Sequence, residues 1–260
     1  MSSTEASGSG DISRSLELLW GTGPRPSRGP KPALTLDRIV TAAVELADAE
    51  GIAAVSMRRL STELGTGTMS LYRYVPGKAE LLDLMLDRVQ GEPLDTPAAA
   101  ERAASGQDWR SAVDAMAREH LALVRRHPWL LAINRARTVL GPSALRSLEA
   151  SLGPLSDIGL SDPEKISVVL MVESYVAGTA RREFETVEAV RETGLSDERF
   201  WGSQEPYLES AMASGEFPGL AGLSPDTFDA EFDHFEFGLS RLIDGLEKLV
   251  SERIGRRDKA

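Results

Sequence analysis

The sequence predicts an all-α protein, and three observations support this fold class. Apolar residues recur three and four positions apart along most of the 260-residue chain, which is the spacing of one helical face. No stretch of useful length alternates apolar and polar residues as a half-buried strand does. Proline stands at Pro142 and Pro163, in the first turn of two expected helices, where its missing N–H costs no helical hydrogen bond.

Residues 1–33 form an arm rich in serine, glycine and proline, and we expect most of it to be disordered. Its apolar segment, residues 15–20, favours a helical turn that packs on the protein's own surface. Arg25, Arg28 and Lys31 precede the first expected helix. Basic residues in that position suit an arm that reaches the minor groove or the phosphates of DNA, and equally a solvated linker. The sequence leaves both readings open.

The first expected helix spans residues 36–50. Thr35 is its candidate N-cap, and Gly51 is its expected end. One face of this helix is apolar at helical spacing. The residues on that face are Leu36, Ile39, Val40, Ala43, Leu46 and Ala47.

The segment 56–78, SMRRLSTELGTGTMSLYRYVPGK, predicts two short helices joined by a glycine turn. Ser56 can cap the first helix, and Gly65 can adopt the positive φ that a sharp turn needs. The second helix, from Thr68 to about Val75, buries Leu71 and leaves mostly polar and aromatic side chains outside. A helix-turn-helix places its second helix in the major groove, so this pattern predicts DNA binding.

A fourth helix, residues 78–89, follows the motif and carries apolar side chains three and four apart. With residues 34–78 it gives an arrangement that resembles the TetR family of bacterial transcriptional regulators. The run LGTGTMSLYRYVPGKAELL carries the resemblance, in the order of its turn glycine, small polar residues, Leu-Tyr pair and helix-opening lysine. The resemblance implies a three-helix DNA-binding domain over residues 34–90. It also implies a helical ligand-binding and dimerisation domain over residues 91–260.

Matching the family's motif position by position implies a set of DNA-binding residues. These are Arg58, Thr68, Met69, Ser70, Tyr72, Arg73, Tyr74 and Lys78. Arg73 suits bidentate donation to guanine O6 and N7, and Lys78 with the first amides of its helix suits a phosphate. Two other readings stay open: one tyrosine can belong largely to the core, and Arg59 can pair with a nearby glutamate.

The net charge of −11 is unusual for a DNA-binding protein, but the charge is unevenly distributed along the chain. Residues 25–78 carry eight lysines and arginines against five acidic residues, whereas residues 79–260 carry twenty against thirty-two. Because salt screens exposed charges beyond about 8–10 Å, the local sign matters more than the total. The division gives modest support to DNA binding at one end of the molecule.

Beyond a break at residues 91–108, the pattern predicts helices over residues 109–127, 129–137, 142–155, 163–193, 196–213 and 227–254. The last helix has a seam at alternating spacings of four and three, typical of helix pairing, and its expected neighbour is the long helix over residues 163–193. In the family, the last helix and the long central helix form a four-helix dimer interface. The implied interface residues are Ile166, Ala177, Phe232, Phe235, Leu239, Leu242, Leu246 and Leu249. The alternative is that this seam packs inside one subunit. A dimer is favoured, because a DNA-binding domain of this size normally needs two half-sites for useful affinity.

The resemblance also implies a small-molecule pocket within the C-terminal helices. Large or amphipathic residues at plausible lining positions are Met116, His120, Trp129, Asn134, Met171, Tyr175 and Trp201. Each of them also suits an ordinary core position. The sequence does not specify the ligand.

Several function classes lack support in the sequence. The chain has no cysteine and three histidines without metal-ligand spacing, and it shows no phosphate loop, nucleophile elbow or dinucleotide motif. We therefore expect no enzyme activity, no cofactor and no metal. No apolar run reaches membrane-spanning length and no signal peptide is evident, so we expect a cytoplasmic protein that binds no membrane.

These observations together predict a homodimeric repressor that a small-molecule effector releases from an inverted-repeat operator. Two alternatives remain at this point. The same fold can activate transcription or work without an effector. The C-terminal helices can instead be a protein-interaction module, with the seam of the last helix recruiting a different partner.

Overall fold

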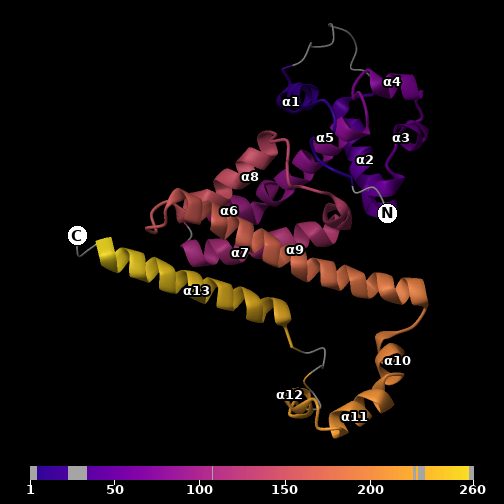
Figure 1. Cartoon of the computed structure of the whole chain (residues 1–260). Helices are drawn as coiled ribbons and strands as arrows, with labels where there is room; N and C mark the ends of the chain where they lie inside the picture. The colour runs from indigo at the N-terminus through magenta and orange to yellow at the C-terminus, as the bar shows by residue number, and fades with distance from the viewer. Residues whose placement is uncertain (1–4, 23–33, 107, 225–226, 228–231, 258–260) are drawn as a thin grey trace.

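The computed structural model describes residues 5–22, 34–106, 108–224, 227 and 232–257. In this part of the chain every element is helical, which confirms the all-α fold, and one isolated bridge pairs Ala6 with Asn134. Figure 1 shows helices α1–α5 at one end of the molecule and a second helical layer beside them. Helices α10–α12 project from that layer as an arm.

The helix-turn-helix forms as the sequence predicts. Helix α2 (Leu36–Glu50) begins at Thr35, whose hydroxyl accepts the Arg38 N–H, and α3 (Met57–Glu63) begins at Ser56, which accepts the Arg59 N–H. Caps of this kind satisfy amides that have no partner in the first helical turn. Gly65 has a φ of 60°, a backbone conformation that side chains with a Cβ avoid, and it turns the chain toward α4.

Helix α4 (Thr68–Tyr72) is shorter than predicted, because regular helix stops before Arg73. The buried positions are nevertheless those expected, since Leu71 and Val75 are fully enclosed. A short 3₁₀ turn, Ile52–Ala54, joins α2 to α3, and α5 (Lys78–Gly91) leads from the motif into the second layer. The core of this end is continuous with that of the C-terminal helices.

Residues 5–22 of the N-terminal arm form ordered structure. Helix α1 (Ile12–Trp20) is capped by Asp11 and packs against α5, as the apolar segment predicted. The order has a polar cause that the composition does not reveal, because hydroxyls and amides of this N-terminal segment bind buried carboxylates of α5. Arg25, Arg28 and Lys31 lie outside the described residues.

The second layer contains α7 (Trp109–Arg126), α8 (Pro142–Leu152) and α9 (Asp162–Thr193), close to the predicted bounds. Two elements differ from expectation. The predicted break contains α6 (Pro97–Ser105), where Thr96 caps an alanine-rich stretch of good helix formers. The predicted piece at 129–137 is a 3₁₀ turn, Pro128–Ala132, followed by irregular chain.

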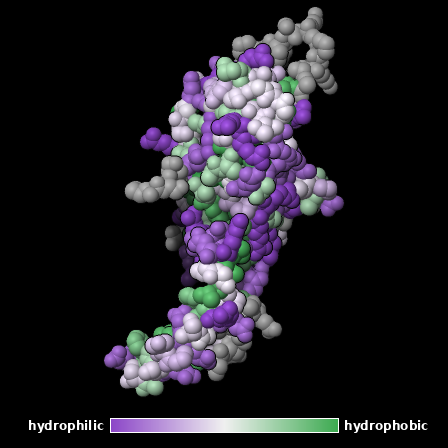
Figure 2. Space-filling view, turned by 90° about the vertical axis from the view of Figure 1, so that its right-hand side faces the viewer, coloured by the Kyte–Doolittle hydropathy of each residue, from purple (hydrophilic) through white to green (hydrophobic). Residues whose placement is uncertain are grey.

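The arm contains α10 (Asp197–Gly202), α11 (Glu205–Ala213) and α12 (Pro218–Ala221) in place of the single helix predicted for residues 196–213. Its aromatic side chains are exposed, among them Trp201 at 59 % and Tyr207 at 78 %. Figure 2 shows hydrophobic residues at several places on this part of the surface. Apolar side chains gathered on an exposed element indicate a contact surface for another molecule.

Helix α13 (His234–Arg257) begins later than the predicted helix, and Phe228 lies outside the described residues. The structure corrects the partner expected for its seam. Leu239 and Leu246 are buried within the subunit, and α13 packs chiefly on α7 rather than on α9. A heptad pattern shows which face of a helix is buried and does not show which helix covers it. None of the described helices is long and apolar enough to cross a lipid bilayer.

Candidate DNA-reading surface and effector region

Helix α4 presents the side chains expected for base reading. Leu71 anchors its inner face, while Met69 is 76 % exposed and Tyr72 is 44 % exposed. Arg73 is also exposed, and its guanidinium lies 3.4 Å from the hydroxyl of Ser70. Thr68 contacts the hydroxyl of Ser61 on α3 at 3.1 Å, which holds the start of the reading helix against its neighbour. The outer face of α4 therefore carries small, uncharged side chains at its start and a cationic side chain, Arg73, at its end.

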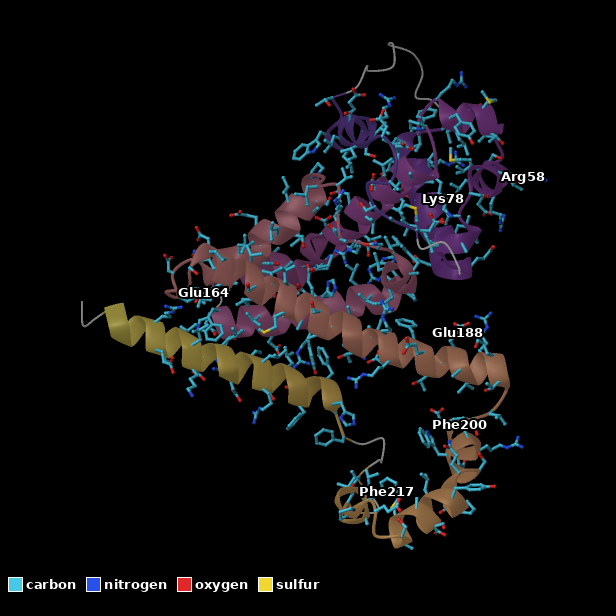
Figure 3. All side chains as sticks on the ribbon, viewed as in Figure 1. Arg58, Lys78, Glu164, Glu188, Phe200 and Phe217 are labelled. Atoms are coloured by element: carbon cyan, nitrogen blue, oxygen red, sulfur yellow. The ribbon has the colours of Figure 1, made fainter. Side chains whose placement is uncertain are left out.

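The two arginines of α3 have different surroundings. Arg58 is exposed and points away from the body of the molecule (Figure 3). Arg59 forms ion pairs with Glu50 at 2.8 Å and with Glu63 at 3.1 Å. The hydrogen bond and charge of Glu50 raise the pKa of Arg59 above its ordinary value. The alternative in which Arg59 pairs with a glutamate is thus confirmed, and Arg58 keeps a free surface.

The two tyrosines of the motif divide in the same way. Tyr72 faces outward, whereas Tyr74 is partly buried and packs against the hydrophobic core. Lys78 is partly buried, and its ammonium binds the carboxylate of Glu5 at 2.7 Å and the carbonyl of Ile52 at 3.2 Å. A phosphate at Lys78 would have to compete with Glu5.

Helix α5 carries three acidic residues on a largely buried surface: Glu80, Asp83 and Asp87. The N-terminal segment donates to two of them. Asp83 accepts from the Ser7 hydroxyl at 2.7 Å, the Gly8 amide at 3.0 Å and the Ser15 hydroxyl at 2.8 Å, and Glu80 accepts from the Asp11 amide at 2.8 Å. Asp87 caps the start of α8 through the amides of Ser143 and Ala144. These bonds fix α5, the helix that joins both parts of the molecule.

A second polar contact joins α2 to the end of α7. The buried imidazole of His127 lies between Asp48 at 2.7 Å and Glu92 at 3.1 Å, and the indole of Trp129 also donates to Asp48 at 2.7 Å. The sequence predicted only that His127 lies at a helix end. Neither this contact nor the role of Asp83 was found from the sequence, although acidic residues on the apolar face of a predicted helix could have pointed to Asp83.

The structure does not gather all seven predicted effector residues. Met116 and Met171 are partly buried against the core, and Trp129 is enclosed and engaged with Asp48. Asn134 is exposed, with its side chain accepting the Ala136 amide. Trp201 lies on the projecting arm.

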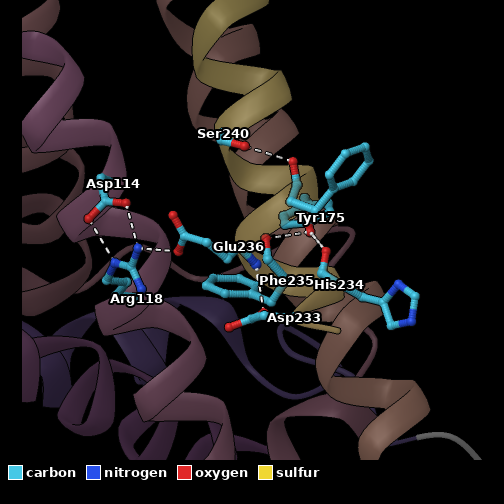
Figure 4. Close-up of polar contacts among 9 residues, drawn as sticks. Asp114, Arg118, Tyr175, Asp233, His234, Phe235, Glu236 and Ser240 are labelled. Carbon is cyan, nitrogen blue, oxygen red and sulfur yellow. Dashed lines mark hydrogen bonds and ion pairs between the residues drawn. The ribbon is translucent and has the colours of Figure 1, made fainter. Parts of the chain in front are cut away.

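Tyr175 has a structural role at the junction of α9 and α13. Its hydroxyl donates to the carbonyls of His234 and Phe235, and its ring stacks on Phe235 (Figure 4). Nearby, Arg118 of α7 binds Asp114 and Glu236. The start of α13 is therefore held by both α7 and α9.

His120 is the predicted effector residue with the most unusual environment. It lies on α7, partly buried, and its pKa is lowered to about 4 by burial first and by the positive charge of Arg135 second. The imidazole is therefore neutral at pH 7. Two surface hollows lie elsewhere and include none of the predicted effector residues. One is lined by Ser156, Asp157, Gly159, Leu160, Ser161, Glu164 and Arg253, and the other by Arg110, Ser111, Asp114, Ala115, Glu236, Ser240, Ile243 and Asp244.

The predicted interface residues lie in two environments. Ile166 is 40 % exposed and Phe232 is 52 % exposed, and Ala177 is partly exposed. Phe235, Leu242 and Leu249 are partly buried, while Leu239 and Leu246 are covered by their own subunit, so the last two are corrected to core positions. Exposed apolar side chains that were not predicted for the interface include Leu170 of α9 and Phe237 of α13, both at 56 %.

Comparison with known families explains this architecture. The family model described as bacterial regulatory proteins of the tetR family matches residues 39–85, and the model described as a tetracyclin repressor-like C-terminal domain matches residues 102–250. The chain belongs to the TetR family. It is therefore a DNA-binding transcriptional regulator, with α3 and α4 as its helix-turn-helix.

Two relatives of this TetR-family regulator are informative. The HTH-type transcriptional repressor DrrR1 of Streptomyces coeruleorubidus is 60 % identical over 253 residues, which cover 97 % of this chain and 92 % of that one. Apo ActR of Streptomyces coelicolor has a similar solved structure, with a TM-score of 0.66, 31 % identity and coverage of 86 % and 99 %. ActR in complex with actinorhodin gives a TM-score of 0.65, with 29 % identity and coverage of 84 % and 96 %.

Proposed function

We propose that this regulator is a homodimeric repressor that leaves an inverted-repeat operator when a small-molecule effector binds among its C-terminal helices. The observation that carries this proposal is the outward display of Met69, Tyr72 and Arg73 on a helix anchored by Leu71. The close similarity to the repressor DrrR1 supports repression as the sign of regulation.

In this proposal each subunit places α4 in the major groove of one half-site. Arg58 and Arg73 have exposed guanidiniums that reach phosphates or base edges, whereas Arg59 is held by its glutamates. Two-fold symmetry requires half-site centres about 34–36 Å apart, or a multiple of that distance. The bound dimer represses by blocking polymerase.

Release follows if the effector prefers an arrangement of the dimer whose reading heads no longer match the groove spacing. An effector with equal affinity for both arrangements shifts nothing. A tenfold loss of DNA affinity needs about 1.4 kcal/mol of coupling. Helix α5 is the natural lever, because it enters the reading head at Lys78 and is bound at Asp87 by the first turn of α8.

The test is selection of genomic fragments by the purified full-length protein, with sequencing of the bound DNA at two salt concentrations. A short inverted repeat over a promoter supports the proposal, whereas a site upstream of the polymerase footprint favours activation. Uniform, salt-labile binding would contradict sequence-specific regulation. Because solved ActR complexes contain actinorhodin and (S)-DNPA, these two compounds are the first effectors to test for release of the recovered DNA.

A further inference from the structure

The helices α10, α11 and α12 make up an arm, residues 195–223, that leaves the body of the subunit. None of the three helices contains a buried residue, and no side chain of the arm belongs to the hydrophobic core. Beyond Leu195, the hydrogen bonds that the structure describes for the arm join arm residues to one another. The body of the subunit therefore gives the arm no hydrophobic core to pack on.

Helices as short as these need such a core. They contain 6, 9 and 4 residues, whereas isolated helices shorter than about 12–15 residues are marginal in water. Helix α9 leads out of the body in the same way, because its last buried residue is Ala180 and the helix continues to Thr193, about 20 Å further at 1.5 Å per residue. Figure 1 shows this end of α9 carrying the arm away from the second layer. Short helices in this position indicate that another surface covers them.

The arm presents enough apolar surface for a stable contact. Figure 3 shows Phe200 and Phe217 on separate helices of the arm. An enclosed aromatic side chain buries about 150–250 Å². The exposed aromatic residues of the arm therefore offer several hundred Å², a large share of the about 800 Å² that each partner contributes to a standard interface. The exposed apolar residues of the arm are Phe200, Trp201, Tyr207, Leu208, Met212, Phe217, Leu220 and Leu223.

The charge of the arm limits what can cover it. Residues 195–223 contain five acidic residues and one basic residue, Arg199. Such a surface is repelled by the phosphates of DNA and by anionic lipid headgroups. On the body of the subunit, Arg137 and Arg182 are exposed and form no ion pair with any described residue, so they can meet these carboxylates. The arm therefore suits a protein surface that carries cations.

The position of the arm in the chain favours a second copy of this protein as that surface. Exposed apolar residues continue from Leu170 through Val187 on α9 into the arm. They resume after the arm at Phe232, just before α13, and at Phe237 within it. A second subunit that covers the exposed side chains of α9 and α13 thus adjoins the arm as well. A two-fold axis would form the same contact twice, once with each arm.

We propose that the α10–α12 arm packs against the C-terminal helices of a second copy of this chain, so that two subunits exchange arms across a two-fold axis. The inference rests on the homodimer of the proposed function and adds the element by which each subunit holds the other. A dimer formed through α9 and α13 alone would leave the arm aromatic residues in solvent, and the exchanged arms cover them.

The first test uses the absence of cysteine from the chain, which makes a single introduced thiol unique. Tyr207→Cys, labelled with benzophenone-4-maleimide and irradiated in the full-length protein, should give a covalent dimer on a denaturing gel. Mass spectrometry should place the cross-link in residues 109–193 or 234–257. Met69→Cys is the matched control, since Met69 is 76 % exposed and Tyr207 78 %, and without DNA it should give no covalent dimer.

Cross-links from position 207 that stay within one chain, or no cross-link at all, would overturn the proposal. So would irradiation in a cell extract that joins position 207 to a different protein while the purified protein gives no covalent dimer. A covalent dimer that forms equally from position 69 would show random collision and would also count against the arm.

The second test compares two variants of α11. Leu208 and Ser210 lie on opposite sides of this helix, since two residues correspond to about 200° of rotation. Leu208→Glu should raise the dissociation constant of the dimer at least tenfold in analytical ultracentrifugation, because it places a charge on the apolar side. Ser210→Glu adds the same charge to the other side and should leave the constant unchanged. Equal constants for both variants and the parent protein would contradict the exchange of arms.

These outcomes are separable from those of the proposed function. A protein that has the mass of two chains and selects an inverted repeat, but gives no covalent dimer from position 207, retains its role as a regulator and loses the exchanged arm. A protein that gives the covalent dimer but selects no DNA sequence retains the arm contact and loses the regulator mechanism. A protein with the mass of one chain contradicts both.

Discussion

Three arginines of the helix-turn-helix differ in what surrounds them. Arg58 and Arg73 are exposed, whereas Arg59 is held between Glu50 and Glu63. A guanidinium engaged by two carboxylates offers less charge and fewer free donors to DNA than one facing solvent. The distinction separates residues that the sequence places side by side.

Arg73→Ala should relax base preference at one position of the half-site and weaken binding there by about 1–3 kcal/mol. Binding to operator variants at fixed salt measures both effects. Arg59→Ala is the matched control, because it removes the same charge from the same motif while its guanidinium is already paired. If Arg59→Ala changed base preference as strongly as Arg73→Ala, the assignment of the reading face would be wrong.

Lys78 and Glu5 provide a prediction about affinity without specificity. Lys78→Ala should weaken binding to all sequences alike and reduce the salt slope by about one counterion. Glu5→Gln should have the opposite effect, since it frees the ammonium that Glu5 now holds at 2.7 Å. The logarithm of affinity plotted against the logarithm of salt concentration tests the pair. Parallel plots for all three proteins would exclude a phosphate at Lys78.

His120 should make stability depend on pH in the acid range. Its pKa is about 4 in the folded protein and about 6.5 when unfolded, so below pH 6.5 the unfolded state binds a proton that the folded state does not. The free energy of unfolding should therefore fall as pH drops from 6.5 to 4, by about 3 kcal/mol in total. Urea unfolding at several pH values measures this loss. It should be absent in His120→Gln and present in His234→Gln, which alters an exposed histidine.

At the scale of elements, the N-terminal segment shows how buried polar contacts can order a stretch whose composition is rich in serine and glycine. Asp83 is buried at 1 % exposure, and three neutral donors from residues 7, 8 and 15 satisfy its carboxylate. The segment also pairs with Asn134, and Trp20 donates to the carbonyl of Leu140 at 3.3 Å. The N-terminal segment thus binds both α5 and the chain that precedes α8.

Ser15→Ala should lower the free energy of unfolding by about 1–3 kcal/mol, because one oxygen of a buried carboxylate loses its donor. Ser9→Ala is the control, since Ser9 is exposed in the same segment. Denaturation by urea compares the two variants with the parent protein. Equal stability of both variants would show that the contact to Asp83 contributes nothing measurable.

The sequence predicted most of the helices for identifiable reasons. Thr35 and Ser56 are strong caps, and Gly65 marks a turn that other residues avoid, so local chemistry alone placed the motif. Local chemistry did not predict α6, and it did not predict that residues 196–213 form two helices rather than one. The amphipathic pattern is weak in both segments and therefore carries little information. The sequence predicted the apolar seam of α13 but not the helix that covers it, because the periodicity of a helix shows which face is buried and not which element packs against that face.

The functional residues likewise divide into those that local sequence patterns predict and those that depend on tertiary packing. The reading face follows from the motif, so Met69, Tyr72 and Arg73 lie outside as expected. The effector residues depend on how distant helices meet, and the structure encloses Trp129 against Asp48 while it leaves Asn134 and Trp201 exposed. Long-range contacts of this kind are set by tertiary packing rather than by propensity.

At the scale of the whole molecule, the exposed apolar side chains require an explanation. Ile166 and Leu170 on α9 and Phe237 on α13 face solvent in the single subunit, and these two helices lie together at the Tyr175 contact and at the Arg253–Glu164 pair. A stable interface buries about 1,200–2,000 Å² in total. An isologous contact through α9 and α13 would cover these side chains and orient two reading heads by a two-fold axis.

Leu170→Arg tests this arrangement, because a two-fold contact places the introduced charge against the partner surface without disturbing the core of its own subunit. The variant should elute with the mass of one chain, while the parent protein elutes as two. It should also bind its operator no better than non-specific DNA, at a dissociation constant of about 10⁻⁴–10⁻⁶ M, since a single head reads one half-site. Leu145→Arg on α8, with similar exposure, should remain dimeric and bind normally. A Leu170→Arg protein that stays dimeric and binds its operator would place the interface elsewhere, and the projecting arm of α10–α12 would then be the next surface to examine.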